Sequence, residues 1–153
     1  MPLVGVRRAL LGRNELGKNL MVNPQLANNA AGWAIGSVTI TQNGPNGANS
    51  VAMLGTGSAS FIYCNQNATL VVGGWYVLSG WFDARNVVSG KIKVFLNNPP
   101  YTSANLDSGS GFASSSPFRA TQAANNILLG PYAAAIANGL YAYISLPSLV
   151  RIA

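Results

Sequence analysis

Histidine is absent from this 153-residue chain, and cysteine occurs once, as Cys64. A single thiol cannot form a disulfide within the chain, and without histidine the usual zinc and haem ligand sets are incomplete. The same absence removes the Ser-His-Asp relay and the histidine that would activate a cysteine nucleophile. The sequence therefore predicts no internal disulfide, no transition-metal site and no triad-type hydrolase.

Acidic residues are also scarce, since the chain contains only Glu15, Asp83 and Asp107. Hydrolysis of a glycosidic bond usually needs two carboxylates held at a defined separation. A calcium site needs several oxygen ligands, many of them carboxylates. We therefore expect a protein that is not an enzyme and that holds neither a metal nor a cofactor.

Charged residues of both signs make up 8% of the chain, which has a net charge of +6 and 49% hydrophobic residues. Amides and hydroxyls must therefore keep the protein in solution. Few charges mean little electrostatic repulsion between copies, which favours a surface partly buried in a larger assembly. No run approaches the ~18 apolar residues of a membrane span, and the early arginines follow a short apolar run, unlike in a signal peptide.

The first eighteen residues differ from the rest and predict a docking arm over 1–18, followed by one domain over 19–153. Their four basic residues against one acidic residue give +3, half of the net charge, and glycines interrupt any regular element. An alternative is a solvated basic tail. Nucleic acid is not the expected partner, because no aromatic residue accompanies the basic ones. The residues expected to contact a partner protein are Val4, Val6, Arg7, Arg8, Leu10, Leu11 and Arg13.

The body of the chain has the pattern of an all-β protein. Its central stretch, GWYVLSGWFDAR at 74–85, is apolar on both faces of an extended strand, as in the middle of a sheet. No run of ten or more residues has helical period, and turn-forming residues recur at short intervals. A β-sandwich of about eight to ten short antiparallel strands is predicted. The other expected strands are 19–24, 37–41, 51–54, 59–64, 69–72, 91–96, 118–122, 127–129, 140–146 and 149–152.

Three further segments have patterns of their own. The lysines of 91–96 face outward and indicate a half-buried or edge strand. Residues 101–116 are rich in serine and glycine and are expected to form a long loop with one weak strand at Phe112. Residues 133–137 are alanine-rich and are expected to form one helical turn.

Several short motifs, in this order, resemble the jelly-roll carbohydrate-binding modules of the CenC type. The same module recurs in bacteriophage minor tail, tail-fibre and capsid-decorating proteins. The resemblance covers residues 19–146 and implies a jelly-roll fold. In that family the closing strand usually has an aspartate that helps to hold a structural calcium ion, and YAYISLPSL here has none. The matching residues are Asn19-Leu20, Asn23-Pro24, Gly32-Trp33, 74–79, Ala84-Arg85, Tyr141, Ile144 and Leu146.

A sugar-binding site of the kind that the resemblance implies uses flat aromatic faces and nearby polar groups. For each aromatic candidate the alternative is core packing, and for Asp83 with Arg85 it is a structural ion pair. Asn43 is a further polar candidate. The carbohydrate-binding candidates are Trp33, Trp75, Tyr76, Trp81, Asp83 and Arg85.

Together these features predict a non-enzymatic accessory protein of a bacteriophage virion, made in the host cytoplasm and anchored on the capsid or tail by its arm. Its expected partners are other virion proteins, symmetric copies of itself and a host-surface glycan, with no membrane and no nucleic acid. The alternative is a carbohydrate-binding module that recognises a cell-surface polysaccharide. The two hypotheses are compatible in one protein.

Overall fold

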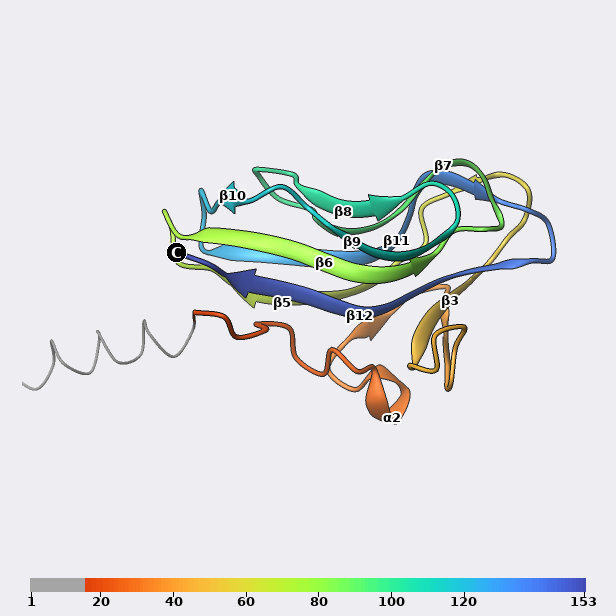
Figure 1. The fold of residues 1–153 in the computed structure, drawn as a ribbon, viewed down its shortest axis with the longest axis horizontal. Coiled ribbons are helices and arrows are strands. Elements are labelled where there is room, and N and C mark those ends of the chain that lie inside the picture. Colours follow the sequence, from red (N-terminus) through yellow and green to blue (C-terminus); the bar gives the residue numbers. More distant parts are fainter. Residues whose placement is uncertain (1–15) are drawn as a thin grey trace, which may run out of the picture.

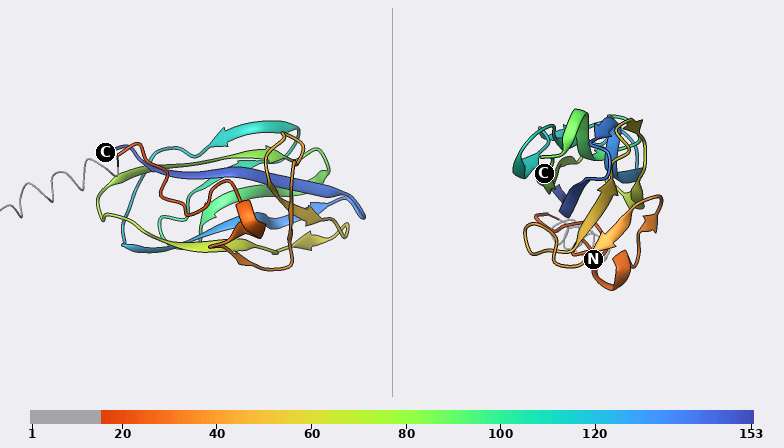
Figure 2. Two further views of the ribbon diagram at one scale, coloured as in Figure 1. Left: turned by 90° about the horizontal axis from the view of Figure 1, so that it is seen from below. Right: turned by 90° about the vertical axis from the view of Figure 1, so that its right-hand side faces the viewer.

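The computed structural model describes residues 16–153, which form two six-stranded antiparallel sheets packed face to face. In Figure 1, β6 and β12 of one sheet cross in front of β11 and β5 of the other. The elongated body that they form is also seen from two other sides in Figure 2. The predicted all-β sandwich is confirmed.

Sheet A has the strand order β10-β6-β12-β3-β2, and β9 also pairs with β6. The two longest of these strands, β6 and β12, lie side by side in its middle. The strands of sheet A are β2 (Thr39–Thr41), β3 (Ser50–Leu54), β6 (Trp75–Asp83), β9 (Ser110–Ser114), β10 (Phe118–Arg119) and β12 (Tyr141–Arg151).

Sheet B has the order β1-β5-β11-β7-β8, with the short β4 also pairing with β11. One short helix, α2 (Ala27–Ala30), precedes both sheets in the described chain. The strands of sheet B are β1 (Ala34–Ile35), β4 (Ala59–Ser60), β5 (Cys64–Thr69), β7 (Val87–Leu96), β8 (Ser103–Leu106) and β11 (Ala124–Ile136).

The core lies between the sheets and is built from alternate residues of each strand. In β6, Tyr76, Leu78 and Phe82 are fully buried. The Tyr76 ring stacks on Phe118, with 5.9 Å between ring centroids, and its hydroxyl accepts a hydrogen bond from the backbone N–H of Val71. The even-numbered face of β6 is therefore the core face, which the sequence left undecided.

Residues 16–33 lie along one side of the sandwich, where α2 lies below β3 and β12 in Figure 1. The backbone N–H of Leu20 donates to the carbonyl of Leu149 at 2.8 Å, so this segment adds a short stretch of backbone pairing to sheet A beside β12. Leu26 is fully buried, and the indole N–H of Trp33 donates to the carbonyl of Asn23 at 3.1 Å. The expected strand at 19–24 is reduced to a single bridge at Asn19, because the chain turns inward to place apolar side chains in the core.

The predicted boundary between arm and domain falls within a segment that touches the body. Leu16 forms a bridge with Arg151, and the backbone N–H of Gly17 donates to the Arg151 carbonyl at 2.9 Å. All seven predicted docking residues, between Val4 and Arg13, lie outside the described residues. The docking arm therefore stays a prediction.

The expected bounds of two strands, 59–64 and 69–72, are wrong. Strand β5 runs through Asn65, Gln66 and Asn67, where the polar run was expected to end a strand. Amides are tolerated here because the side chains of Asn65 and Asn67 accept hydrogen bonds from Asn126 on the neighbouring β11. The preceding segment, 61–63, is irregular instead, and 70–74 forms a turn.

Other differences follow from long-range pairing. The alanines of 133–137, expected to form a helical turn, fall mostly in β11, where pairing with β7 and β4 overrides their helix propensity. The two strands expected at 140–146 and 149–152 form one strand, β12 (Tyr141–Arg151), which continues through an irregularity between Ser145 and Ser148. The expected loop at 101–116 contains β8, which pairs with β7, and the strand expected at Phe112 is confirmed as β9, which pairs with β6. Strand β7 is consequently an internal strand.

Candidate functional site

The outer face of sheet B carries a cluster of aromatic side chains. In β7 the core-facing residues Ile92 and Val94 alternate with Lys93 and Phe95, so the latter two point outward. Tyr132 of β11 lies opposite Lys91 and shares this outer face. Three further rings come from irregular segments next to these strands. We call the set of Phe61, Tyr63, Phe95, Tyr101 and Tyr132 the sheet B aromatic cluster.

The rings of the cluster pack edge to face. Phe61 and Tyr132 have centroids 5.5 Å apart, Phe95 and Tyr132 5.7 Å, and Tyr63 and Phe95 5.6 Å. Such contacts hold rings in fixed orientations and contribute about 0.5–1.5 kcal/mol per pair. Burial, and secondarily Tyr132, raises the pKa of Tyr63, so the hydroxyl of Tyr63 stays protonated at neutral pH. The cluster is a pre-arranged surface of rings.

Gly130 explains how segment 61–63 reaches this face. A Cβ atom at Gly130 would collide with the carbonyl oxygen of Ile62 and would come within 3.1 Å of the Tyr63 ring. The missing side chain lets the segment cross closely over β11. Phe61 and Tyr63 are thereby brought against rings from strands that are distant in sequence.

A pocket of about 280 Å³ opens at one side of the cluster. Tyr101, in the turn between β7 and β8, and Tyr132 line it together with Phe95. Tyr101 is 70% exposed and Tyr132 is 49% exposed, so both rings present area to the solvent. The polar lining comes from Lys93, Asn97 and Ser103. The pocket thus combines aromatic surface with hydrogen-bonding groups.

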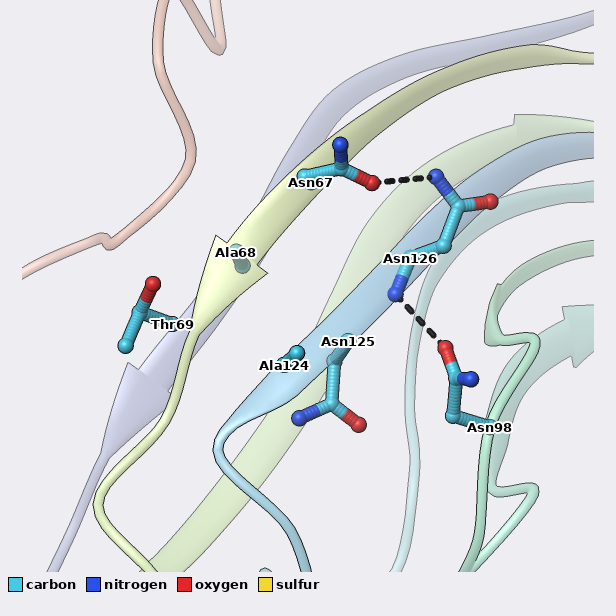
Figure 3. A pocket seen from close by; sticks show the side chains of 7 residues that line it. All are labelled: Asn67, Ala68, Thr69, Asn98, Ala124, Asn125 and Asn126. Atoms are coloured by element: carbon cyan, nitrogen blue, oxygen red, sulfur yellow. Dashed lines mark hydrogen bonds between the residues drawn. The ribbon is translucent and has the colours of Figure 1, made fainter.

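A second pocket, of about 340 Å³, lies along the same sheet and is lined by amides. Figure 3 shows Asn126 between Asn67 and Asn98, with its side chain donating to Asn67 Oδ1 at 3.0 Å and its backbone N–H donating to Asn98 Oδ1 at 2.8 Å. Because Asn98 directly follows Asn97 of the first pocket, the two pockets adjoin. Together they form a surface with aromatic rings at one end and amides at the other.

Asn125 marks an unfilled hydrogen-bonding position in the amide pocket. Its side-chain nitrogen donates to the carbonyls of Gln122 and Ala123, at 3.0 and 3.2 Å. Its side-chain oxygen is buried and has no hydrogen-bond donor among the described residues. Buried acceptors of this kind usually have a partner, so a hydroxyl or a water is expected there.

The tryptophans and tyrosine predicted from the sequence lie elsewhere. Trp75 and Trp81 both face outward, but on sheet A, on the side of the sandwich opposite the aromatic cluster. Tyr76 is fully buried and Trp33 is 7% exposed, so neither offers an open ring face and both pack in the core. Asn43 lies in the 42–49 loop, away from both pockets. The structure does not bring the predicted aromatic residues together into one site.

The expected pairing of Asp83 with Arg85 is present. The carboxylate of Asp83, almost fully buried, accepts hydrogen bonds from the Arg85 guanidinium, with Arg85 Nε at 2.8 Å from Oδ1. The Arg85 backbone N–H also donates to Oδ1 at 3.2 Å. These hydrogen bonds and the positive charge hold the pKa of Asp83 below its ordinary value, although burial opposes the shift. The pair is structural, at the end of β6.

We expect Asp83→Asn to destabilise the protein at pH 7 and to lose this effect as the pH falls through the folded pKa of Asp83. The folded pKa of Asp83 is lower than the value of ~3.9 in an unfolded chain. The stabilisation is therefore fully present above about pH 5 and is lost as the pH falls through the folded pKa. Urea unfolding midpoints of the wild type and the variant, measured at pH 7 and at a series of lower pH values, test this. Asp107→Asn, at an exposed residue that bonds only to Ser108, is the control, and an equal loss in both variants would contradict the prediction.

Cys64 is fully buried, and burial raises its pKa to about 12, so its thiol is protonated at neutral pH. Among residues 16–153 no three His, Cys, Asp or Glu side chains are grouped to hold a metal ion. No helix in this described range is long and apolar enough to cross a membrane.

Sequence reasoning missed the sheet B cluster. Lys93 and Phe95 belong to an alternating segment that the sequence did identify, and the outward position of Lys93 was expected. Phe61, Tyr101 and Tyr132 carry no common sequence pattern, because long intervals separate them and only strand pairing makes them neighbours. Period-two alternation in 91–96 was the one available indication.

Comparisons with solved structures give the same fold at low sequence identity. A family 61 carbohydrate-binding module, TmCBM61, in complex with β-1,4-galactotriose has a TM-score of 0.62 and 16% identity, over 88% of this chain and 99% of that one. A family 16 carbohydrate-binding module has a TM-score of 0.59 and 16% identity, over 86% and 99%.

A third similar structure has a viral source. The enzymatically active domain of bacteriophage CBA120 tailspike protein 4 has a TM-score of 0.59 and 13% identity, over 88% of this chain and 21% of that one.

Neither protein-family models nor curated proteins match the chain. The chain therefore has the jelly-roll fold of carbohydrate-binding modules, as the resemblance implied.

Proposed function

We propose that this protein is a non-catalytic carbohydrate-binding module whose site is the outer face of sheet B. The observation that carries this proposal is the aromatic cluster beside two adjoining pockets. The apolar face of a sugar ring packs on an aromatic ring, while its hydroxyls exchange hydrogen bonds with amides and hydroxyls. Exposed Tyr101 and Tyr132 supply rings, and Asn98 and Asn126 supply amides. The fold of the solved carbohydrate-binding modules supports the same role.

Sheet A is the less suitable face for this function. Asn46 donates to the Ser145 hydroxyl at 2.9 Å, so the 42–49 loop covers part of its outer surface. Trp75 and Trp81 lie six residues apart on β6, about 20 Å along an extended strand, and neither lines one of the two pockets on sheet B. The carboxylate of Asp83 already forms an ion pair with Arg85.

The absence of catalysis is part of the proposal. Asp83 is held by Arg85, and Asp107, the other acidic side chain among residues 16–153, is exposed beyond the end of β8. Neither lines the two pockets. Glycosidase chemistry requires a pair of carboxyl groups that flank one bond. A glycan on sheet B would be bound without being cleaved.

We expect Tyr132→Ala and Tyr101→Ala each to weaken glycan binding by about tenfold or more, since aromatic side chains that a ligand covers contribute most of the binding energy. A glycan array identifies a ligand, and isothermal titration with that ligand then measures affinity. Both side chains are substantially exposed, so neither substitution should unfold the protein. Trp75→Ala is the control, because Trp75 is similarly exposed but lies on sheet A.

Three results are decisive for this proposal. Loss of affinity in the tyrosine variants with normal binding by Trp75→Ala supports the sheet B site. Loss in Trp75→Ala or Trp81→Ala alone would place the site on sheet A. Failure of the folded wild-type protein to bind any glycan on the array would end the proposal.

A bacteriophage virion is the second candidate setting, in which the module would be an accessory protein on the capsid or tail. The low charge content, the basic residues before Asn19 and the tailspike domain among the similar structures favour it. In this setting the arm would dock on other virion proteins and sheet B would adhere to a host-surface glycan. Deleting residues 1–15 should abolish attachment to particles while leaving glycan affinity intact, and unchanged attachment would contradict the arm's role.

A further inference from the structure

We propose that the pocket beside the aromatic cluster takes an acidic sugar residue, whose carboxylate or sulfate group pairs with the ammonium group of Lys93. This inference rests on the proposed function and specifies its ligand. It starts from Lys93, the cation in that pocket, which has no acidic side chain of the described residues as a partner.

Lys93 is held in place by an aromatic ring and not by an acid. Its Nζ atom lies 4.6 Å from the centroid of the Tyr132 ring, a cation–π contact. Two acidic side chains lie within residues 16–153, and neither pairs with Lys93: Asp83 pairs with Arg85, and Asp107 accepts a hydrogen bond from Ser108. The backbone register places Gly130 directly beside Lys93, and segment 61–63 occupies the space over that glycine, so the open side of the lysine faces the pocket lined by Tyr101 and Ser103.

The titratable groups around Lys93 do not favour its charge. Lys91 lies two residues away on the same face, and the other titratable side chains next to Lys93 are the tyrosines Tyr132, Tyr63 and Tyr101. On the β8 side, Asn105 faces Lys93, and Asp107 beyond it bonds to Ser108. Burial and the charge of Lys91 lower the pKa of Lys93. A bound anion would offset both effects.

The other groups of the pocket match the remaining parts of a sugar residue. Tyr101 and Tyr132 can contact the apolar face of the ring, and Asn97 and Ser103 can bond its hydroxyls. A hydrogen bond between an ammonium group and a carboxylate or sulfate is about twice as strong as a neutral one. Neutral amides alone, as in the adjoining pocket, would not distinguish an acidic from a neutral saccharide. Lys93 is therefore the group expected to determine specificity.

The test is titration of the full chain with trigalacturonate, with a sulfated galactan oligosaccharide and with neutral β-1,4-galactotriose. We expect an acidic oligosaccharide to bind at least about tenfold more tightly than the neutral one. Lys93→Gln should remove this preference, while Lys93→Arg should retain most of it. Lys91→Gln is the matched control, because Lys91 is a neighbouring lysine outside the pocket. Urea midpoints confirm that all variants fold.

Each outcome has a defined meaning. Preference for trigalacturonate, or for the sulfated sugar, supports the inference and identifies the acidic group. Equal binding of acidic and neutral sugars, or equal losses in Lys93→Gln and Lys91→Gln, would overturn it while leaving carbohydrate binding standing. If neither these sugars nor any glycan on the array binds, the proposed function itself fails.

Discussion

Phe82→Ala is expected to lower the free energy of unfolding by about 3–5 kcal/mol, a large part of the 5–15 kcal/mol typical of a domain. Phe82 is fully buried in the core between the sheets. It lies opposite Ile144, where the central strands β6 and β12 pair, so neighbouring side chains have little freedom to fill the cavity. The thermal midpoint should fall by about 10 °C or more.

Phe112→Ala provides the matched control for this prediction. Phe112 belongs to the same sheet, on the adjacent β9, but its side chain is 71% exposed. Its removal creates no cavity and should change stability by about 0.5 kcal/mol or less. Urea unfolding of both variants measures the difference. Similar losses in the two variants would show that the face of sheet A that we assign to the core is not the buried one.

Gly130→Ala is expected to reduce both stability and glycan binding. The new methyl group would collide with the Ile62 carbonyl, and backbone atoms cannot rotate away as a side-chain end can. The cost of such overpacking is about 1–3 kcal/mol. Segment 61–63 would have to move off β11, which would displace the rings of Phe61 and Tyr63. A thermal melt and a glycan titration on the same sample measure both effects.

Gly80→Ala separates this site effect from a general cost of adding a methyl group. A Cβ atom at Gly80 would meet the side-chain atom Val94 Cγ2 at 3.0 Å, inside the core and away from segment 61–63. We expect a moderate loss of stability with unchanged glycan affinity. If Gly130→Ala retained full affinity, the positions of Phe61 and Tyr63 would not matter for binding.

The two pairs of variants address different parts of one structure. The Phe82 pair tests which face of sheet A is buried, and the Gly130 pair tests how an irregular segment completes the surface of sheet B. In the proposed function, the core supports both sheets, and the outer face of sheet B meets the glycan. A stable fold with altered binding is therefore an attainable result for variants of the outer face.

The sequence by itself determined the class of fold. Alternation with period two in 74–85 and 91–96 identified strands β6 and β7, because side chains of an extended chain point alternately to its two faces. The scarcity of carboxylates and the absence of histidine predicted a protein without catalytic activity, and this stays a prediction. The pairing of Asp83 with Arg85 was also predictable, since residues two apart are close enough to form an ion pair.

The tertiary structure alone decided which side of each strand is buried and which rings meet. The sequence left both faces of β6 equally apolar, and only packing against sheet B selected Tyr76 and Phe82 for the core. The cluster around Tyr132 joins residues from four separate parts of the chain, and their proximity depends on strand order and register. A shift of one residue in register would turn every side chain of a strand to the opposite face. Short-range patterns carry no information on that register, so the site could be located only in the folded protein.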